Sequence, residues 1–580
     1  MKAFITITLW CIILLLITAC IVLIFVDYST FCNFILSVTG AVEREKQLKE
    51  VFLPIDRFVT YKYCISGVLT LFIFLCIYLL KQVKSICKYL ILIASIVKQE
   101  TNGWSNFFIS LSVTERVVLS GIIFAGWFSS VYFLNIIPVT IDEALTYLFC
   151  TRYSILASCS YYAIPNNHIL FSILTNFTSI LPFDPLVNLR IPNIFIVVFT
   201  NILFFRYSLK FFNRGVAFIC LTLFEFTFMN FFYSFQARGY EIVLLVSLIV
   251  FYCITVITET KTTTGKHFFY YSLASIVWFY TMPSFLYPFT AATFFGYYFL
   301  LSRKQFPSLK KLVLSNLITV FCVGILYSPV IIISGIKSII ANPYSKPIPR
   351  LAVFQGIIPH FKETARWIFG IRNESTALLL MIIAIVTLLI ASYKTQNSTK
   401  IKLLASILLA APIIVLLHSV IPYPRTWIFL SVSVFISLGV FINYFFHKPL
   451  SKPPIYIPVV ILCIFALLTS FRPTYQNLYT YESQEFCIKD IDLNVDLEDI
   501  NSIGYEDSNS ATILKYKILS RYRNKKDIVM VSSDKPECYN ADCILLTYGC
   551  PNFFSLISGK YKIVSSTNSK CGMMLLKKTI

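Results

Sequence analysis

Long apolar segments recur along most of the chain and are separated by short polar connections. A helix needs about 20 apolar residues to cross about 30 Å of hydrocarbon. Thirteen segments have this character, near 4–26, 64–81, 117–138, 191–206, 214–232, 241–258, 267–282, 285–302, 312–335, 376–392, 403–419, 425–446 and 455–471. The segment 86–97 is too short to span and is predicted to lie along the interface. The pattern predicts an all-α polytopic membrane protein with about 13 transmembrane helices.

The pattern changes at about residue 472. Charged residues return, and the apolar runs shorten to strand length in "DIVMVSS", "CILLTYG", "YKIVSS" and "GMMLLKK", with a helical stretch at 509–522. This predicts a small C-terminal α/β domain. It would contain five cysteines whose connectivity sequence cannot give, namely Cys487, Cys538, Cys543, Cys550 and Cys571. We therefore divide the chain into N-terminal extra helices with an interfacial segment (1–116), a transmembrane core (117–471) and an extracytoplasmic domain (472–580).

Composition supports a membrane protein and gives its orientation. Hydrophobic residues make up 57% of the 580 residues and charged residues 13%, against about 25% charged in soluble domains. The net charge of +21 is dispersed between the apolar segments, which favours positive-inside loops over nucleic acid binding. The apolar run at 4–26 is too long for a signal peptide and is read as an uncleaved anchor.

With the N-terminus inside, alternating loops place lysine and arginine on the cytoplasmic side, for example at 81–88, 206–214, 303–311 and 448–452. The sequence thus predicts a multi-pass protein of the plasma (inner) membrane. Residues 139–190, 336–375 and everything after about 472 then lie on the outer, periplasmic side. In the outer loops, 168–181 is predicted to lie along or re-enter the membrane, and "HFKETARWIFG" to form an interfacial helix.

Two adjacent carboxylates, Asp142 and Glu143, follow the segment that ends at Pro138, in "VTIDEALTYL". Thr140 and Glu143 have the spacing of a capping box, and acidic residues suit the first turn of a helix. Both residues therefore fit a helix start. If Glu143 caps, Asp142 lies about 100° away around the helix and is free to face a cavity. The local sequence leaves structural and chemical roles open.

Four motifs on the predicted outer side occur in a recognisable order: the Asp-Glu pair with "PNNHILFSIL" (165–174), "LRIPNIF" (189–195), "YSFQARGYEI" (233–242) and "YPRTWIFL" (423–430). Together they resemble the polyprenyl-phosphate-dependent GT-C glycosyltransferases, such as the protein O-mannosyltransferases and the aminoarabinose lipid A transferases. The resemblance covers about residues 117–471. Where that family often has His-x-Pro-Pro, this chain has Asn166-Asn167-His168-Ile169, with no prolines directly after the histidine.

The resemblance implies a membrane hexosyl- or pentosyltransferase. Its donor would be a sugar on a polyprenyl phosphate, and its acceptor a glycan, lipid or protein at the outer face of the bilayer. Asp142 is expected to be the catalytic base, with Glu143 as its support or as a cap. The expected substrate-binding residues are His168, Gln236, Arg238, Tyr240 and Arg425.

Each of these residues also has a plainer interpretation. Arg238 and Arg425 are expected to hold the leaving phosphate, but an arginine at an interface also simply snorkels to water. A tyrosine at this depth is ordinary for the interfacial belt. A histidine at this position is more often hydrogen-bonded to neighbouring protein groups than a ligand of a substrate. Glu225, inside an apolar segment, is a further functional suspect without an assigned partner.

The sequence assigns no cofactor. The five histidines and scattered cysteines show no zinc-site spacing, and no Walker loop occurs. A divalent metal ion is left open. Two alternatives remain: a transporter or flippase for lipid-linked saccharides, which should show internal repeats, and a polysaccharide ligase or polymerase, which would not need the Asp-Glu pair.

Overall fold

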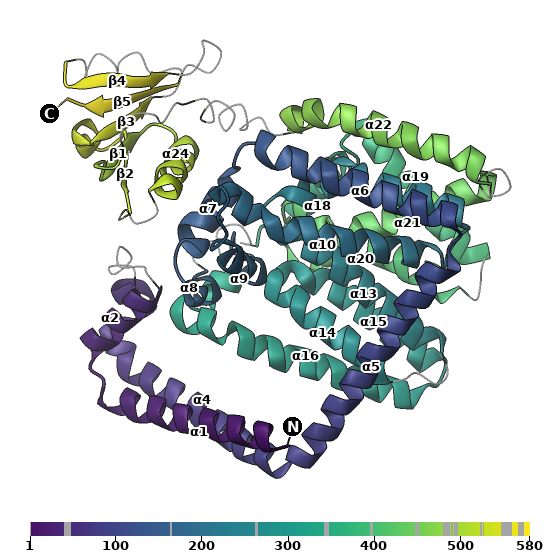
Figure 1. Ribbon diagram of the computed structural model, residues 1–580, viewed down its shortest axis with the longest axis horizontal. Coiled ribbons are helices and arrows are strands. Elements are labelled where there is room, and N and C mark those ends of the chain that lie inside the picture. The colour runs from purple at the N-terminus through teal and green to yellow at the C-terminus, as the bar shows by residue number, and fades with distance from the viewer. Residues whose placement is uncertain are drawn as a thin grey trace. The chain divides into compact units, whose positions relative to one another are not determined.

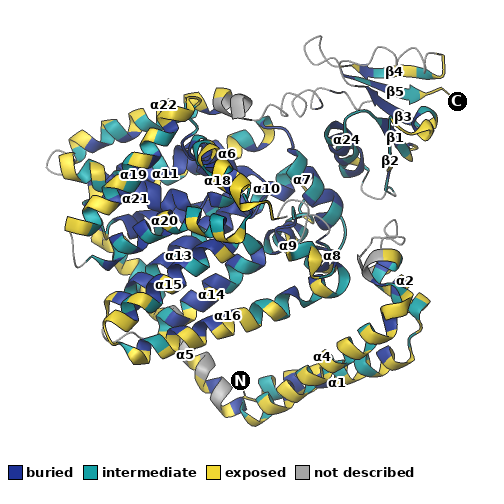
Figure 2. Ribbon diagram, turned by 180° about the vertical axis from the view of Figure 1, so that it is seen from behind, coloured by how far each residue is buried: buried dark blue, intermediate teal, exposed yellow. Residues whose placement is uncertain are grey.

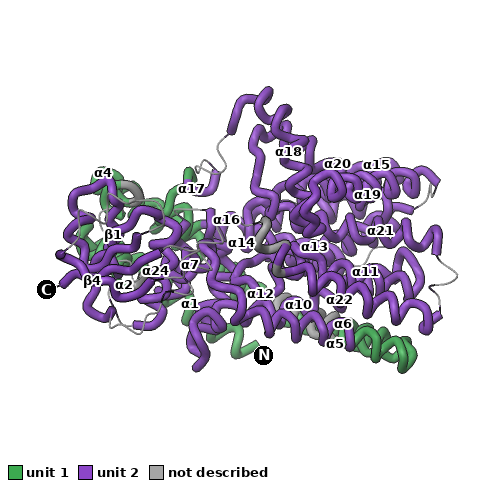
Figure 3. The backbone as a smooth tube through the Cα atoms, turned by 90° about the horizontal axis from the view of Figure 1, so that it is seen from above, with its two compact units in different colours: residues 1–120, 328–337 green, residues 121–327, 338–580 purple. Residues whose placement is uncertain are grey.

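The computed structural model forms two compact units, residues 1–120 with 328–337 and residues 121–327 with 338–580 (Figure 3). The structure describes residues 2–39, 48–162, 165–260, 265–340, 347–394, 398–446, 450, 452–478, 488, 491, 497–522, 525, 527–546, 559–566 and 573–579. The division of the chain into domains at 116 and 471 stays a prediction.

The first unit is built from the N-terminal helices. These are α1 (Lys2–Phe25), α2 (Tyr28–Thr39), the short π-helix η2 (Leu48–Phe52), α4 (Ile55–Lys81), α5 (Val83–Ser110) and the start of α6 (Val113–Ile136). Helices α1 and α4 pack together around buried Leu9, Ile13 and Cys76. The predicted interfacial segment 86–97 is part of the 28-residue helix α5.

The second unit holds the remaining apolar helices, except that residues 328–337, which include the end of α16 and the first residue of α17, belong to the first unit (Figure 1). They are α10 (Pro185–Ser208), α11 (Arg214–Phe226), α12 (Phe228–Phe235), α13 (Tyr240–Glu259), α14 (Gly265–Thr281), α15 (Leu286–Ser302), α16 (Phe306–Ile333), α18 (Arg350–Phe369), α19 (Glu374–Lys394), α20 (Thr399–His418), α21 (Leu430–Phe446) and α22 (Pro453–Leu478). Short elements between them are η4 (Pro283–Phe285), α17 (Lys337–Ile340) and η5 (Pro424–Trp427).

Within the described residues, nine helices are long and apolar enough to cross a membrane, or ten if α11 and α12, bent by 61°, form one span. All thirteen predicted segments fall on helices or on this bent pair. Helices α14, α15 and α21 have 17 residues each, which is shorter than any of the nine candidate spans. The predicted polytopic all-α fold is therefore confirmed.

Burial distinguishes the centre of the second unit from the first unit. The apolar window of α13 is 78% buried inside the protein, whereas that of α1 is 17% buried (Figure 2). Because α1 and α4 bury little of their surface against protein, their apolar side chains suit a lipid environment. The polar residues of α10, α12 and α13 instead lie among other helices, and these helices support the site.

Four short helices form the loop between α6 and α10. They are α7 (Ile141–Thr146), the π-helix η3 (Tyr147–Thr151), α8 (Ile155–Ser160) and α9 (Ile169–Thr178). The segment predicted at 168–181 is α9, a ten-residue apolar helix. The predicted interfacial helix "HFKETARWIFG" lies within α18.

The C-terminal domain contains β1 (Ser502–Tyr505), α24 (Ser508–Arg521), β2 (Val529–Ser532), η7 (Pro536–Asn540), β3 (Cys543–Leu546), β4 (Tyr561–Ser566) and β5 (Met574–Lys578). The sheet order is β2-β1-β3-β5-β4. Strand β1 is parallel to both of its neighbours, β2 and β3. Strand β5 is antiparallel to both of its neighbours, β3 and β4. The predicted α/β domain is confirmed. Cys538 and Cys543 are free thiols, and the other three predicted domain cysteines lie outside the described residues.

Candidate functional site

The Asp-Glu pair begins helix α7, as the capping-box spacing predicts. The backbone N–H of Glu143 donates to Oγ1 of Thr140 (3.4 Å), and the N–H of Thr140 donates to Oε2 of Glu143 (3.0 Å). Two backbone donors that a helix start would leave unpaired are thus satisfied. The capping interpretation is confirmed, and it fixes the direction in which both carboxylates leave the helix.

Glu143 also forms a fully buried ion pair with Arg190 of α10. Nε and Nη2 of Arg190 donate to Oε1 (2.8 Å) and Oε2 (2.7 Å), and both side chains have 0% exposure. Oε1 accepts a further bond from the N–H of Ala237 (2.7 Å), while Arg190 donates to the carbonyls of Leu134, Ile137 and Pro138. Four segments therefore meet at this pair. We call Glu143 with Arg190 the buried clamp.

Asp142 points to a different set of partners. Its Oδ2 lies 3.2 Å from Nη2 of Arg425 and 3.9 Å from Nη2 of Arg238. The side chains of Asp142 and Arg425 are about a quarter exposed, whereas that of Arg238 is 4% exposed. The structure thus brings together three predicted site residues from three distant parts of the sequence. One carboxylate faces two guanidinium groups, so this group carries a net positive charge.

Arg238 is held by a backbone carbonyl and lies beside His168. Its Nη1 donates to the carbonyl of Asn166 (2.8 Å), and its Nη2 lies 3.2 Å from Nε2 of His168. The other ring nitrogen of His168, Nδ1, accepts from the N–H of Gly239 (2.9 Å). A Cβ at residue 239 would lie 2.5 Å from Cγ2 of Thr281 and 3.1 Å from Nδ1 of His168. Glycine is therefore needed here for the close approach of the ring.

The surroundings of Arg238 contain more hydrogen-bond donors than acceptors. Because Nδ1 of His168 accepts, the neutral ring carries its proton on Nε2, which then faces the guanidinium donor of Arg238. Nε of Arg238 and Nε2 of Gln236 are buried and have no hydrogen-bond partner among the described residues. Buried polar groups are normally paired. The site is therefore suited to a ligand that supplies acceptor oxygens.

Gln236 and Tyr240 flank this group. Oε1 of Gln236 accepts from the hydroxyl of Thr140 (3.3 Å), which connects the residue to the start of α7. The ring of Tyr240 lies edge-on to His168 (5.0 Å between centroids) and against Tyr233 (4.1 Å). Tyr240 is 2% exposed. Its ring therefore supports the position of His168 by packing.

The positive charge of the site sets the protonation of its two titratable residues. Burial alone would raise the pKa of Asp142, but the charges of Arg425 and Arg238 outweigh it and hold that pKa below its usual value. Burial, with the charges of Arg238 and Arg425, lowers the pKa of His168 well below its usual value. Asp142 is therefore ionised and His168 neutral at physiological pH.

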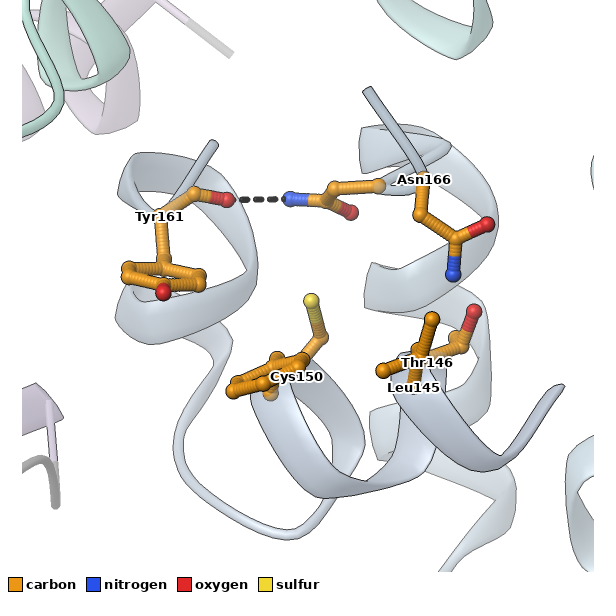
Figure 4. A pocket seen from close by; sticks show the side chains of 7 residues that line it. Leu145, Thr146, Cys150, Tyr161 and Asn166 are labelled. Atoms are coloured by element: carbon orange, nitrogen blue, oxygen red, sulfur yellow. Dashed lines mark hydrogen bonds between the residues drawn. The ribbon is translucent and has the colours of Figure 1, made fainter. Parts of the chain in front are cut away.

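A small pocket lies beside the site, with about 210 Å³ of free space that includes its open mouth. It is lined by Leu145, Thr146, Phe149, Cys150, Tyr161, Asn166 and Asn167 (Figure 4). Asn167 donates to the carbonyl of Tyr161 (2.8 Å), and Asn166 donates to the carbonyl of Asp142 (2.9 Å). One residue of the pocket lining, Asn166, is therefore hydrogen-bonded to the backbone of Asp142.

The residues do not fit a divalent metal ion. Hard cations prefer several oxygen ligands, yet Asp142 faces two guanidinium groups, and both oxygens of Glu143 are engaged by Arg190 and backbone donors. The described part of the chain contains no group of three or more His, Cys, Asp or Glu side chains that could hold a metal. A cation at Asp142 would have to displace both arginines.

Two supporting residues were not predicted from the sequence. Nδ2 of Asn193, one turn after Arg190, donates to the carbonyls of Tyr233, Gln236 and Arg238 and so holds the segment that carries Arg238. Asn166 bonds both Asp142 and Arg238 through its amide and its carbonyl. A buried asparagine in an apolar segment and a doubled asparagine in a loop were the available signals. Glu225 has no contact with the site among the described residues; it is buried near Glu241.

Comparison with known proteins supports the fold. No protein-family model and no curated protein matches the sequence. The crystal structure of ArnT from Cupriavidus metallidurans bound to undecaprenyl phosphate is similar, with a TM-score of 0.51 and 10% sequence identity. The similarity covers 80% of this chain and 98% of that one. At this identity it shows the fold, and the predicted resemblance to GT-C enzymes is confirmed at that level.

Proposed function

We propose that this protein is a membrane glycosyltransferase that moves a sugar from a polyprenyl-phosphate donor to an acceptor at the outer face of the membrane. The observation that carries the proposal is the surplus of donors around Arg238, next to an ionised carboxylate. A phosphate supplies the missing acceptor oxygens and matches arginine geometry. The structurally similar ArnT was solved with undecaprenyl phosphate bound, and this ligand is a polyprenyl phosphate like the one in the proposed donor.

Arg238 and Arg425 would bind the phosphate of the donor. Both guanidinium groups point at one oxygen of Asp142. Phosphate oxygens would replace that carboxylate as their partner, and the N–H on Nε2 of His168 would gain an acceptor. Gln236, with its unpaired amide nitrogen, would donate to the phosphate or the sugar. Tyr240 would act by holding the ring of His168.

The reaction would be a single displacement at the anomeric carbon. Asp142 takes the proton of the acceptor hydroxyl or amine while the acceptor atom bonds to that carbon. The bond from the carbon to the phosphate oxygen breaks, and the polyprenyl phosphate leaves with the extra negative charge. Fixed guanidinium groups stabilise this charge as it develops. Release of Asp142 from both arginines on donor binding would also strengthen it as a base.

Transfer itself is the test. The purified full chain in lipid nanodiscs should bind undecaprenyl phosphate, measured by native mass spectrometry. With polyprenyl-phosphate hexoses and pentoses and a membrane extract, it should add one sugar mass to a lipid, glycan or protein. Movement of an intact lipid-linked saccharide across the bilayer without transfer would instead support the transporter alternative.

The orientation is tested separately. The distribution of lysine and arginine places residue 508 outside and residue 306 inside. In a background without native thiols, a membrane-impermeant maleimide should label S508C and not F306C. The reverse pattern would place the site on the cytoplasmic side and refute the outer-face proposal.

A further inference from the structure

We propose that the C-terminal domain positions the catalytic loop: Tyr516 of helix α24 and Asp527 of the segment before β2 hold α7 and η3 in place, and thereby orient Asp142. The inference rests on the proposed function, since it takes Asp142 to be the base. It gives the C-terminal domain a part in the reaction, with Tyr516 and Asp527 as positioning residues.

The first contact is between two aromatic rings. Tyr516 of α24 lies edge-on to Tyr147 of η3, with 5.1 Å between ring centroids and 86° between planes. The hydroxyl of Tyr147 donates to the carbonyl of Leu519 (3.4 Å). Tyr147 is 7% exposed and Tyr516 4% exposed. Edge-to-face pairs of this kind fix orientation as well as distance. The contact begins five residues after Asp142.

The second contact is ionic and lies at the other end of η3. Nη1 of Arg152 is 3.5 Å from Oδ1 of Asp527, and Arg152 also donates to the carbonyl of Lys525. Lys515 of α24 lies 2.7 Å from the same carboxylate oxygen. Asp527 therefore joins the loop, α24 and the segment before β2. The side chains of Arg152 and Asp527 are 10% and 22% exposed, so solvent only partly screens the pair.

The sequence of α24 is arranged for two neighbours. Eight of its 14 residues are buried, and the helix contacts both β1 and α7 (Figure 2). The ring of Tyr516 and the backbone carbonyl of Leu519, three residues on, both meet Tyr147. A helix covered only by its own sheet would need one apolar face. The additional buried face, with a tyrosine at its centre, indicates a fixed docking contact.

The catalytic loop needs such support. Helix α7 has six residues and η3 five, which is far shorter than an isolated helix that is stable in water. The buried clamp holds the start of α7, and α24 holds η3. Between them, Thr146 donates to the carbonyl of Asp142 (2.9 Å), while Arg238 donates to Oγ1 of Thr146 (3.4 Å). Movement of η3 would therefore reach Asp142 and Arg238 directly.

Hydrogen exchange on the full chain in nanodiscs, without substrate, tests the contact. Tyr516→Ala and Asp527→Asn should increase amide exchange in residues 141–152. Tyr516→Phe keeps the ring and should exchange like the parent. Asp534→Asn, at an exposed site in the same domain, is the matched control and should also leave exchange unchanged. Unaltered exchange at 141–152 in both Tyr516→Ala and Asp527→Asn would overturn the proposal.

Turnover tests the positioning role. A displacement of about 1 Å at a reacting group can cost about 10²-fold in rate, so Tyr516→Ala should lower kcat by at least about tenfold. The fall in kcat should exceed any rise in donor KM, and Tyr516→Phe should restore it. Increased exchange with unchanged kcat would show a contact without a positioning role and would overturn the proposal.

Exchange in strand β3 separates docking from unfolding of the domain. If Tyr516→Ala also loosens residues 543–546, Asp527→Asn decides, because it leaves Tyr516 in place. Failure of the proposed function is distinguishable as well: it would appear as absence of transfer in the parent protein. The exchange result does not depend on transfer.

Discussion

Asp142 and Glu143 are neighbours in the sequence and have the same chemistry, yet their surroundings are opposite. Glu143 has 0% exposure, with both oxygens bonded to one guanidinium group and to backbone donors. Asp142 is about a quarter exposed and has two arginines for one carboxylate oxygen. One group has every bond that it can make. The other stands where charge and donors exceed the acceptors present.

The difference separates structural from chemical roles better than residue type does. A buried ion pair whose hydrogen bonds are all made has no free donor or acceptor for a ligand. Removing one partner would leave an unpaired buried charge where several segments meet. A partly open carboxylate among surplus donors can exchange partners when a ligand arrives. We therefore assign Glu143 to the buried clamp, and we propose Asp142 as the residue that takes part in the reaction.

The largest expected effect comes from breaking the buried clamp. Arg190→Met leaves Glu143 ionised, buried and without its partner, which should destabilise the protein by about 3–5 kcal/mol. The thermal unfolding midpoint in detergent should fall accordingly. Adding Glu143→Gln to Arg190→Met removes the unpaired charge and should recover part of the loss.

Asp184→Asn is the matched control for the clamp variants, because Asp184 is exposed and asparagine also caps a helix. Its midpoint should stay near that of the parent. An Arg190→Met protein as stable as the parent would show that the pair is not structural. The structural role of Glu143, and with it the contrast to Asp142, would then be refuted.

The sequence predicts the segments well and the contacts less well. The length of the apolar runs located all thirteen segments, because spanning a membrane demands long apolar runs. The short strand β1 was missed, since "SIGY" has four residues and a glycine, too little for a strand pattern. The motifs named Asp142, His168, Arg238 and Arg425, which the fold brings together. The roles of Arg190, Asn193 and Asn166 depend on backbone carbonyls that only the folded chain brings close.

The next prediction concerns Arg238 and Arg425, the two arginines that face Asp142. Arg238→Ala or Arg425→Ala should lower kcat/KM for the donor by about 10- to 150-fold, the equivalent of about 1.5–3 kcal/mol for a charge-assisted hydrogen bond. Arg238 should cost more, because it is 4% exposed and Arg425 25% exposed. Arg372→Ala, at an exposed position in the loop before α19, should have little effect. If all three variants had the kcat/KM of the parent, both arginines would be interfacial anchors without a role in donor binding.

The smallest effect is expected on pH dependence. A base acts when deprotonated, and the pKa of Asp142 lies below its usual value. Because kcat/KM reports the free enzyme, kcat/KM should persist as pH falls to below about 3.9, the ordinary carboxyl value. Arg425→Ala removes one of the two charges that oppose burial, so the acid limb of kcat/KM should move to higher pH. An acid limb that moves to lower pH, or does not move, would show that another group titrates.

The most direct test is the turnover of Asp142→Asn. Asparagine keeps the shape of the side chain and suits the first turn of α7, but it cannot accept a proton. The unfolding midpoint and the affinity for undecaprenyl phosphate should stay near those of the parent, while kcat falls by about 10²-fold or more, the usual scale for a lost general base. A folded Asp142→Asn protein with the turnover of the parent would contradict the account and leave both carboxylates as parts of a helix start.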